Sequence, residues 1–333
     1  MRFAKLMMTA AAAMLAAGVA QAADFKPAVI YDMGGKFDKS FNEGVANGVK
    51  RFTDETGVKV MEFEVTNETQ REQAMQRMVQ RGATIVLGVG FAQADAINKV
   101  AGENPDRQFS IIDVFWLDRP NLRQYNFKEH EGSYLVGVAA ALSSKTGKVG
   151  FVGGMDIPLI RKFACGYVQG VKSVSDKIEV LQNMTGTTPA AWNDPTKGAE
   201  LTQGQIDRGA DVVYHAAGGT GMGVIRAAAD AGKLAIGVDS NQNHVAPGTV
   251  LTSMVKRVDV AAYQTFKDAM DGKFSAGIRT LGLKEGGVDW ALDEHNAKLV
   301  SGDVKAKVEK AKAAIIAGGI KVHNYESDKT CPF

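Results

Sequence analysis

The 333-residue chain has no excess of charge of either sign and very few cysteines. Lys and Arg total 39 against 37 for Asp and Glu, so no basic excess is available to displace counterions from phosphates. This balance excludes the usual nucleic-acid binder. Cys165 and Cys331 are the only cysteines, which excludes a C-x-x-C pair and a thiolate metal site. They can bridge the C-terminal tail to the helix around Cys165 or remain two buried thiols, and the sequence leaves both readings open.

Motifs for common catalytic chemistry are also missing. The chain has no G-x-x-x-x-G-K-[ST] phosphate loop, no H-E-x-x-H and no G-x-S-x-G, and its five histidines are scattered singly. Gly219-Thr-Gly221-Met-Gly223 lacks the spacing of a dinucleotide-binding turn. The sequence therefore argues against an enzyme, and we expect neither a cofactor nor a bound metal.

Only one long apolar run is present, and it lies at the N-terminus. Arg2 and Lys5 precede the run Leu6–Val19, which is too short to span a bilayer. An A-x-A-like site, Ala20-Gln21-Ala22, follows it. We expect residues 1–22 to be a cleaved signal peptide. No cysteine lies near the cleavage site to carry a lipid, so the sequence predicts an exported, periplasmic protein without a lipid anchor.

Short apolar runs alternate with helical patterns through the rest of the chain, which predicts an α/β fold. Many runs are continuously apolar, as in parallel strands that are covered on both faces. The expected strands are 28–33, 58–65, 84–89, 109–114, 148–152, 178–183, 211–215, 234–238, 249–255 and 278–283. The helices are marked by apolar stripes, and Ser40-x-x-Glu43 predicts a capping box at the first of them.

The two halves of this pattern resemble each other. In each half the first strand runs into a Gly-Gly pair, Gly34-Gly35 and Gly153-Gly154, and a later strand runs into a Gly-rich turn. This layout predicts two similar lobes that face each other, and the tail after Thr249 is expected to cross again between them. Ligands of such sheets bind beyond the carboxyl ends of the strands.

Polar residues follow the first predicted strand. Asp38 and Asn42 lie in the first strand-to-helix turn, where they could bond the edge of a heterocycle. Ser40 and Phe41 in the same turn are explained equally well by capping and packing. We therefore assign a binding role from the residues alone only to Asp38 and Asn42.

Three further residues are candidates in the second half. Trp192, beside Pro195 in a loop, can stack on a planar ligand or cover its own lobe. Asp239 ends a predicted strand and can accept bonds from two vicinal sugar hydroxyls, or it can form an Asx turn. Lys256 can donate to a ligand hydroxyl or be simply solvated. The residues alone leave these alternatives open.

Several segments, taken in order, resemble the basic membrane protein family of ABC-transporter substrate-binding proteins. They run through nearly the whole chain after residue 22 and are Asp38-Lys-Ser-Phe-Asn42, Glu131-Gly-Ser-Tyr-Leu-Val-Gly137, Lys148-Val-Gly-Phe-Val-Gly-Gly154, Tyr214-His-Ala-Ala-Gly218, Gly237-Val-Asp239 and Thr252-Ser-Met-Val-Lys256. The branch that the chain most resembles binds purine nucleosides.

The resemblance implies a type I periplasmic binding protein, with two doubly wound parallel-sheet lobes joined by three crossovers. It implies an N-terminal lobe of residues 23–127 plus 254–280 and a C-terminal lobe of 128–253 plus 281–333. The implied partners are a small-molecule ligand and the permease and ATPase subunits of an ABC importer, with no nucleic acid, and the protein is expected to be a monomer.

The resemblance also implies roles for individual residues. Asp38 and Asn42 would bond the purine edge, Phe41 matches the aromatic of the motif, and Trp192 stands where the family usually has a stacking Phe. Gly219 would approach the ribose, Asp239 and Lys256 would bind its hydroxyls, and Phe91 would line the wall. Phe37 departs from the pattern, because relatives often have a second acid there.

The sequence thus predicts a periplasmic receptor that closes around a purine nucleoside and presents it to a permease. The alternative ligands are a free purine base such as adenine, or a sugar. A secreted nucleosidase would need a second acid or a metal beside Asp239, which the sequence does not offer. A transcription regulator of the same fold would need a helix-turn-helix before the first strand, where residues 24–27 leave no room for one.

Overall fold

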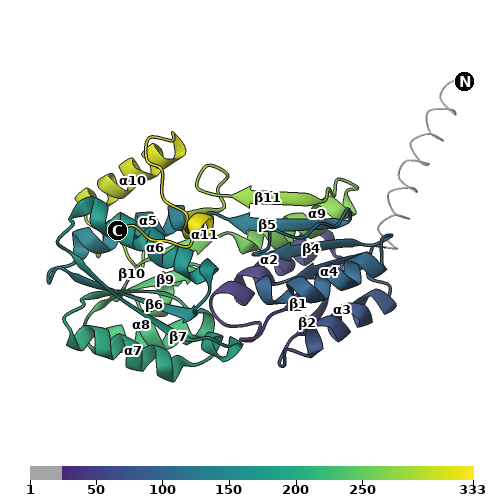
Figure 1. The fold of residues 1–333 in the computed structure, drawn as a ribbon, viewed down its shortest axis with the longest axis horizontal. Coiled ribbons are helices and arrows are strands. Elements are labelled where there is room, and N and C mark those ends of the chain that lie inside the picture. The colour runs from purple at the N-terminus through teal and green to yellow at the C-terminus, as the bar shows by residue number, and fades with distance from the viewer. Residues whose placement is uncertain (1–24) are drawn as a thin grey trace, which may run out of the picture.

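The computed structural model describes residues 25–333, so the expected signal peptide lies outside the described residues. Two six-stranded sheets form two lobes that lie side by side (Figure 1). The first sheet has the spatial order β11 (Gly277–Leu281), β5 (Leu122–Phe127), β4 (Gln108–Ile112), β3 (Ile85–Gly88), β1 (Pro27–Tyr31) and β2 (Met61–Glu64). The second has the order β12 (Val288–Trp290), β10 (Val250–Lys256), β9 (Leu234–Asp239), β8 (Val212–Ala216), β6 (Lys148–Met155) and β7 (Glu179–Gly186).

Helices cover both sheets. Those of the first lobe are α2 (Phe41–Thr56), α3 (Gln70–Gln80), α4 (Ala94–Glu103) and α9 (Val258–Met270). Those of the second are α5 (Glu129–Ser143), α6 (Pro158–Val174), α7 (Pro195–Asp207), α8 (Gly221–Asp230), α10 (Gly302–Ile316) and α11 (Tyr325–Asp328). Four short 3-10 helices are η1 (Phe91–Gln93), η2 (Pro189–Trp192), η3 (Gly218–Thr220) and η4 (Asn243–Val245).

The strand pairing confirms the predicted α/β fold with mostly parallel sheets. All neighbouring strands are parallel except β12, which is antiparallel to β10. The two sheets have the same topology, so β1, β3, β4 and β5 of one correspond to β6, β8, β9 and β10 of the other. This correspondence accounts for the two similar halves of the sequence.

The chain crosses between the lobes three times. It leaves β5 for α5, leaves β10 for α9, and leaves β11 for β12. Residues 254–256 pair with β9 and β12 of the second sheet, so the boundary expected after residue 253 falls inside β10. The chain crosses there only after Lys256, and we place the second crossover at residues 256–258.

Ten predicted strand regions contain a strand, but β5 and β12 were not predicted. Strand β5 has the sequence Leu-Arg-Gln-Tyr-Asn-Phe, which reads as too polar for a buried strand. Arg123 is nevertheless only 1% exposed. Its guanidinium donates to a carboxylate oxygen of Asp268 at 2.7 Å and to the carbonyl of Ser275 at 2.9 Å. These partners lie about 145 residues or more away in the chain, so no local pattern could reveal them.

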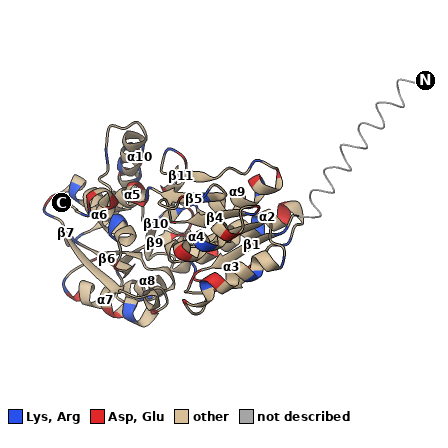
Figure 2. Cartoon of the chain, turned by 45° about the vertical axis from the view of Figure 1, so that its right-hand side comes forward, with Lys and Arg blue, Asp and Glu red and all other residues tan. Residues whose placement is uncertain are grey.

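The apolar stripes of the predicted helices face the core. Val45, Val49 and Phe52 of α2 are buried, as are Val304 and Val308 of α10. Charged residues of both signs lie mixed on the helices of the two lobes (Figure 2). Among residues 25–333, no helix is long and apolar enough to cross a membrane.

The two cysteines are joined. Cys165 of α6 and Cys331 of the C-terminal tail form a disulfide across 166 residues of sequence. This settles the choice that the sequence left open, and it ties the end of the chain to the second lobe.

Candidate functional site

A cavity lies between the lobes, at the carboxyl ends of the strands. The space between protein atoms in the cavity and at its mouth, open solvent included, is about 590 Å³. The first lobe lines it with Asp32, Met33, Asp38, Phe41, Asn42, Gly90, Phe91 and Asp113. The second lines it with Leu159, Ile160, Phe163, Trp192, Ala216, Gly218, Val238, Asp239 and Lys256. Small-molecule sites of α/β proteins are found at such an edge.

Seven of the eight predicted site residues line this cavity, and their binding roles stay predictions. They are Asp38, Phe41, Asn42, Phe91, Trp192, Asp239 and Lys256. Gly219 does not line it, because η3 presents its neighbour Gly218 instead. Phe37 is 70% exposed and is not among the residues that line the cavity, so the departure at this position does not alter the cavity wall.

Asp38, rather than Ser40, caps helix α2. One carboxylate oxygen of Asp38 accepts from the backbone N–H groups of Ser40 at 2.8 Å and Glu43 at 3.1 Å, and the other accepts from that of Asn42 at 3.0 Å. Ser40 makes no side-chain cap, so the predicted capping box is wrong. Burial raises the pKa of Asp38 to about 6 in spite of these bonds.

The hydroxyl of Ser40 instead joins the two lobes. Its Oγ donates to Asp239 Oδ2 at 2.6 Å. In return Ser240 Oγ donates to the carbonyl of Ser40 at 2.8 Å, and Gln242 Nε2 donates to that of Lys39 at 2.9 Å. These bonds hold the start of α2 against the end of β9, so the structure is closed at this point.

Asn42, which lines the cavity, has a side-chain acceptor without a protein partner. Its amide nitrogen donates to the carbonyls of Asp32 and Gly35, both at 3.2 Å, which uses both amide hydrogens. Oδ1 is buried and has no protein partner. A buried acceptor without a partner is costly, so a ligand N–H at this position would bind favourably.

Two aspartates occupy equivalent places in the two sheets. Asp113 follows β4 and Asp239 ends β9, and both have left-handed backbones, with φ of 67° and 61°. Aspartate tolerates this conformation better than most residues, and such backbone strain clusters at functional sites. Burial raises the pKa of Asp239 to about 6. Asp113 and Asp239 are therefore an equivalent pair of carboxylates, one from each lobe.

Lys256 lies in a buried cluster of charges. Its Nζ is 2.6 Å from Asp113 Oδ1 and 2.9 Å from Glu129 Oε1. Glu129 Oε2 is 2.7 Å from the Nζ of Lys162. Burial opposes the charged form of Glu129, but Lys162 and Lys256 outweigh it and lower its pKa to about 2. Asp113 and Glu129 keep Lys256 protonated.

Several lining residues were not predicted. Asp32 and Asp113 directly follow β1 and β4, a position that the rule for parallel sheets could have flagged. Leu159, Ile160 and Phe163 lie on α6, where the sequence shows only an ordinary apolar stripe. Among residues 25–333, no three His, Cys, Asp or Glu side chains gather to hold a metal ion.

The indole of Trp192 lies against Gly154. A Cβ atom at residue 154 would overlap with Cζ3 and Cε3 of the indole ring. Glycine is therefore required at residue 154 for the indole ring to keep its place. A Cβ atom at the neighbouring Gly153 would likewise overlap with the side chains of Met184 and Ile160.

If Trp192 stacks on the ligand, as the sequence predicts, Gly154→Ala should weaken ligand binding about tenfold, because a displaced indole would lose a stacking contact worth roughly 1–3 kcal/mol. Titration calorimetry and the emission of Trp192 would both report it. Gly204→Ala is the matched control, since a Cβ at Gly204 meets nothing within 4 Å. In a Trp192→Phe background the effect should shrink, and an equal effect in both backgrounds would contradict the assignment.

The chain is similar to known substrate-binding proteins over most of its length. Residues 25–325 match the family model Bmp, described as ABC transporter substrate-binding protein PnrA-like. A relative from Lactococcus lactis, named ABC transporter nucleoside-binding protein BmpA, is 34% identical and is matched over 90% of this chain and 89% of its own. A relative from Pyrococcus horikoshii, named an uncharacterized lipoprotein, is 35% identical over 82% of this chain and 70% of its own.

A solved structure also matches. The ABC transporter solute-binding protein from Aeropyrum pernix superposes with a TM-score of 0.83 and 30% identity, covering 90% of this chain and 93% of that one. The match supports the two-lobed fold.

Proposed function

The chain belongs to the Bmp family of ABC transporter substrate-binding proteins, and from this we propose that it binds a purine nucleoside between its lobes and delivers it to a membrane permease. Proteins of this class bind solutes for transport, so the chain is a binding protein and not an enzyme. The specific ligand and the monomeric state are part of the proposal.

The observation that carries the proposal is the mixed wall of the cavity. Flat aromatic side chains lie beside carboxylates, and they come from both lobes: Phe41, Phe91 and Asp113 from the first, and Trp192 and Asp239 from the second. Aromatic faces suit a base, and a carboxylate suits the paired hydroxyls of a ribose. A ligand that touches both lobes favours the closed state over the open one.

Asn42 supports a base with an N–H at its edge. The unpartnered Oδ1 of Asn42 can accept from an exocyclic amino group or a ring N–H of a purine. The name of the Lactococcus lactis relative, a nucleoside-binding protein, agrees with this ligand class.

A thermal-shift screen tests the proposal. The protein is unfolded without reductant, to keep the Cys165–Cys331 disulfide, and refolded to remove carried ligand. The panel contains purine and pyrimidine nucleosides, free bases, 5′-monophosphates, ribose and other sugars. A ligand at 100 times its Kd adds about 2.7 kcal/mol of stability.

Each outcome of the screen is decisive. Stabilisation by nucleosides but not by bases supports the proposal. Stabilisation by adenine alone keeps the transport role and replaces the ligand. No stabilisation by any purine overturns the ligand assignment. Monophosphates should bind weakly, since Asp32, Asp38, Asp113 and Asp239 face the cavity against Lys256 alone.

We predict that affinity for the nucleoside falls about tenfold between pH 7 and pH 5 for each carboxylate that the ligand needs ionised. Burial raises the pKa of Asp239 to about 6, and the ligand hydroxyls donate to its ionised form, so protons compete with the ligand below that value. Calorimetry across this range measures the slope. Asp239→Asn should give a shallower profile, and an unchanged profile would contradict the role of Asp239.

The proposal includes export by a signal peptide cleaved after Ala22, without a lipid anchor. Both cysteines of the 333 residues are in the disulfide, so neither is free to carry a lipid. Disulfides persist in oxidising compartments, which supports a periplasmic location. N-terminal sequencing and mass measurement of the exported protein test both points.

A further inference from the structure

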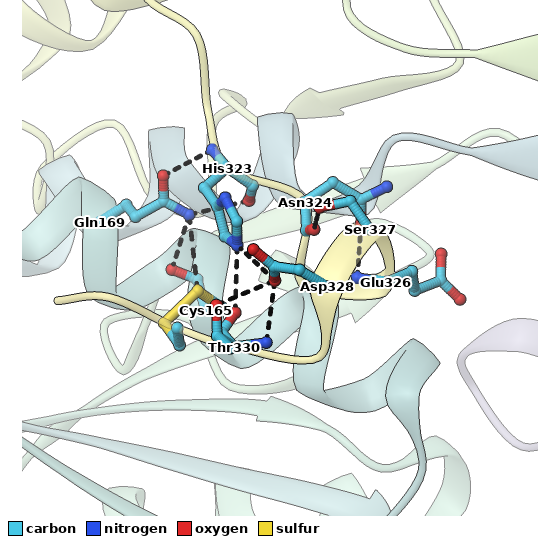
Figure 3. Close-up of a disulfide and its surroundings, with 9 residues drawn as sticks. Cys165, Gln169, His323, Asn324, Glu326, Ser327, Asp328 and Thr330 are labelled. Carbon is cyan, nitrogen blue, oxygen red and sulfur yellow. Dashed lines mark hydrogen bonds and ion pairs between the residues drawn. A yellow bond between two sulfur atoms is a disulfide. The ribbon is translucent and has the colours of Figure 1, made fainter.

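The C-terminal segment, residues 320–333, is fastened to α6. Figure 3 shows the disulfide with the side chains around it. Gln169 Nε2 donates to the carbonyl of His323 at 3.0 Å, and the N–H of His323 donates to Gln169 Oε1 at 2.7 Å. Helix α11 has only four residues and could not form alone, so these links decide where it lies.

The fastened segment delivers one carboxylate to the interior. Glu326 of α11 has a side chain that is 12% exposed, and its Oε2 lies 2.7 Å from Lys162 Nζ. Lys162 is 1% exposed, and its Nζ also donates to the carbonyl of Phe127 at 3.1 Å. Phe127 ends β5, where the chain first crosses between the lobes. Lys162 thus links Glu326 to the start of a crossover.

From Glu326 a row of alternating charges leads to the ligand cavity. Glu326, Lys162, Glu129, Lys256 and Asp113 follow one another with N–O distances of 2.7, 2.7, 2.9 and 2.6 Å. Glu129 is the only acid in this row with a lysine on each side. Both lysines lie at ion-pair distance from it, but neither contact has the alignment of a hydrogen bond.

The position of Glu129 therefore depends on the other acidic partner of each lysine, which is Glu326 for Lys162 and Asp113 for Lys256. Buried charges interact strongly, and a buried cation that loses one partner attracts the remaining one more strongly. Without Glu326, Lys162 would draw Glu129 toward itself and away from Lys256. Lys256 would then be held at the cavity wall by Asp113 alone.

We propose that Glu326 is a positioning residue for the ligand site, which neutralises Lys162 so that Glu129 can hold Lys256 beside Asp113. The disulfide acts through the same residue, since it keeps α11 in place. The inference rests on the proposed function in one respect: the position of Lys256 affects binding only if the cavity is the ligand site.

The test uses the full exported chain with Glu326→Gln, which removes the charge and keeps the size. Ser327→Ala is the matched control, because Ser327 lies on the same helix and its Oγ bonds only to the carbonyl of Asn324. Adenosine and inosine are titrated into each protein by calorimetry. Hydrogen exchange is followed by mass spectrometry in the ligand-free proteins, in peptides that cover residues 126–132 and 254–260.

We expect Glu326→Gln to weaken nucleoside binding about fivefold and to speed exchange in both peptides, with the control equal to the wild type. In a Lys162→Met background, Glu326→Gln should no longer matter, since no cation remains there to neutralise. A Cys165→Ser/Cys331→Ser variant should also bind the nucleoside more weakly than the wild type, as Glu326→Gln does.

The failure of this inference and that of the proposed function are distinguishable. If the wild type binds adenosine or inosine and Glu326→Gln binds within twofold of it, the positioning role is overturned. If the wild type binds neither nucleoside, the proposed ligand is wrong, and the positioning role of Glu326 is then tested by hydrogen exchange alone. Equal exchange at 254–260 in the variant and the wild type then overturns the link between Glu326 and Lys256.

Discussion

Asp239→Asn is expected to weaken binding of a purine nucleoside about 100-fold and to change binding of the corresponding free base less than about threefold. The carboxylate of Asp239 lines the cavity and can accept from two ribose hydroxyls, whereas an asparagine offers one acceptor oxygen. A charge-assisted hydrogen bond contributes about 1.5–3 kcal/mol. A loss near the upper end of this range lowers the affinity about 100-fold.

The asparagine variant should fold like the wild type. Asparagine has the same shape and, like aspartate, tolerates the left-handed backbone found at residue 239. It can also still accept from Ser40 Oγ, which bonds Asp239 in the wild type. The change therefore removes charge without removing the contact between the lobes.

Calorimetry with paired ligands, adenosine with adenine and inosine with hypoxanthine, measures this effect. Asp54→Asn, an exposed substitution on α2, is the control. A nucleoside affinity within threefold of the wild type would remove Asp239 from the ribose site and favour a free base as the ligand. An equal loss for base and nucleoside would place Asp239 beside the base instead.

Lys256→Met is expected to lower the free energy of unfolding by about 3–5 kcal/mol, the usual cost of removing one partner from a buried ion pair. Lys256 is 2% exposed and stands between Asp113 and Glu129, which would be left buried at close range with one cation fewer. Guanidinium unfolding, followed by circular dichroism, measures the loss.

Two comparisons show whether charge is the cause. Lys50→Met changes an exposed lysine of α2 and should have little effect. The loss in Lys256→Met should be smaller at pH 5 than at pH 7.5. Burial raises the pKa of Asp113 to about 6 even beside Lys256, and the loss of Lys256 raises it further above the unfolded value, so the folded variant gains stability by binding a proton as the pH falls. A loss below about 1 kcal/mol at pH 7.5 would show that the cluster contributes little.

Much of the fold could be predicted because its signals are local. Continuous apolar runs mark strands that are covered on both faces, and Val45, Val49 and Phe52 mark the buried side of α2 as the structure has it. Strand β5 was missed because Arg123 finds its partner Asp268 through the tertiary fold. A pattern that counts apolar residues cannot see such a partner.

The capping box failed for a similar reason. The spacing of Ser40 and Glu43 is correct, but Asp38 also lies close enough to accept from the same backbone N–H groups. Ser40 is left free to bond Asp239, which is 199 residues away in the sequence. Local spacing shows which residues can cap a helix, and the structure shows which one does.

The sequence by itself determined the class of fold, the family and seven of the residues that line the cavity. These follow from periodicity and from short motifs at strand ends, which are local properties of the chain. Only the tertiary structure decided that Cys165 and Cys331 are joined, that Asp113 mirrors Asp239, and that Glu326 reaches Lys162. Each of these depends on distances between atoms of residues far apart in the chain, which are set when the two sheets close on each other.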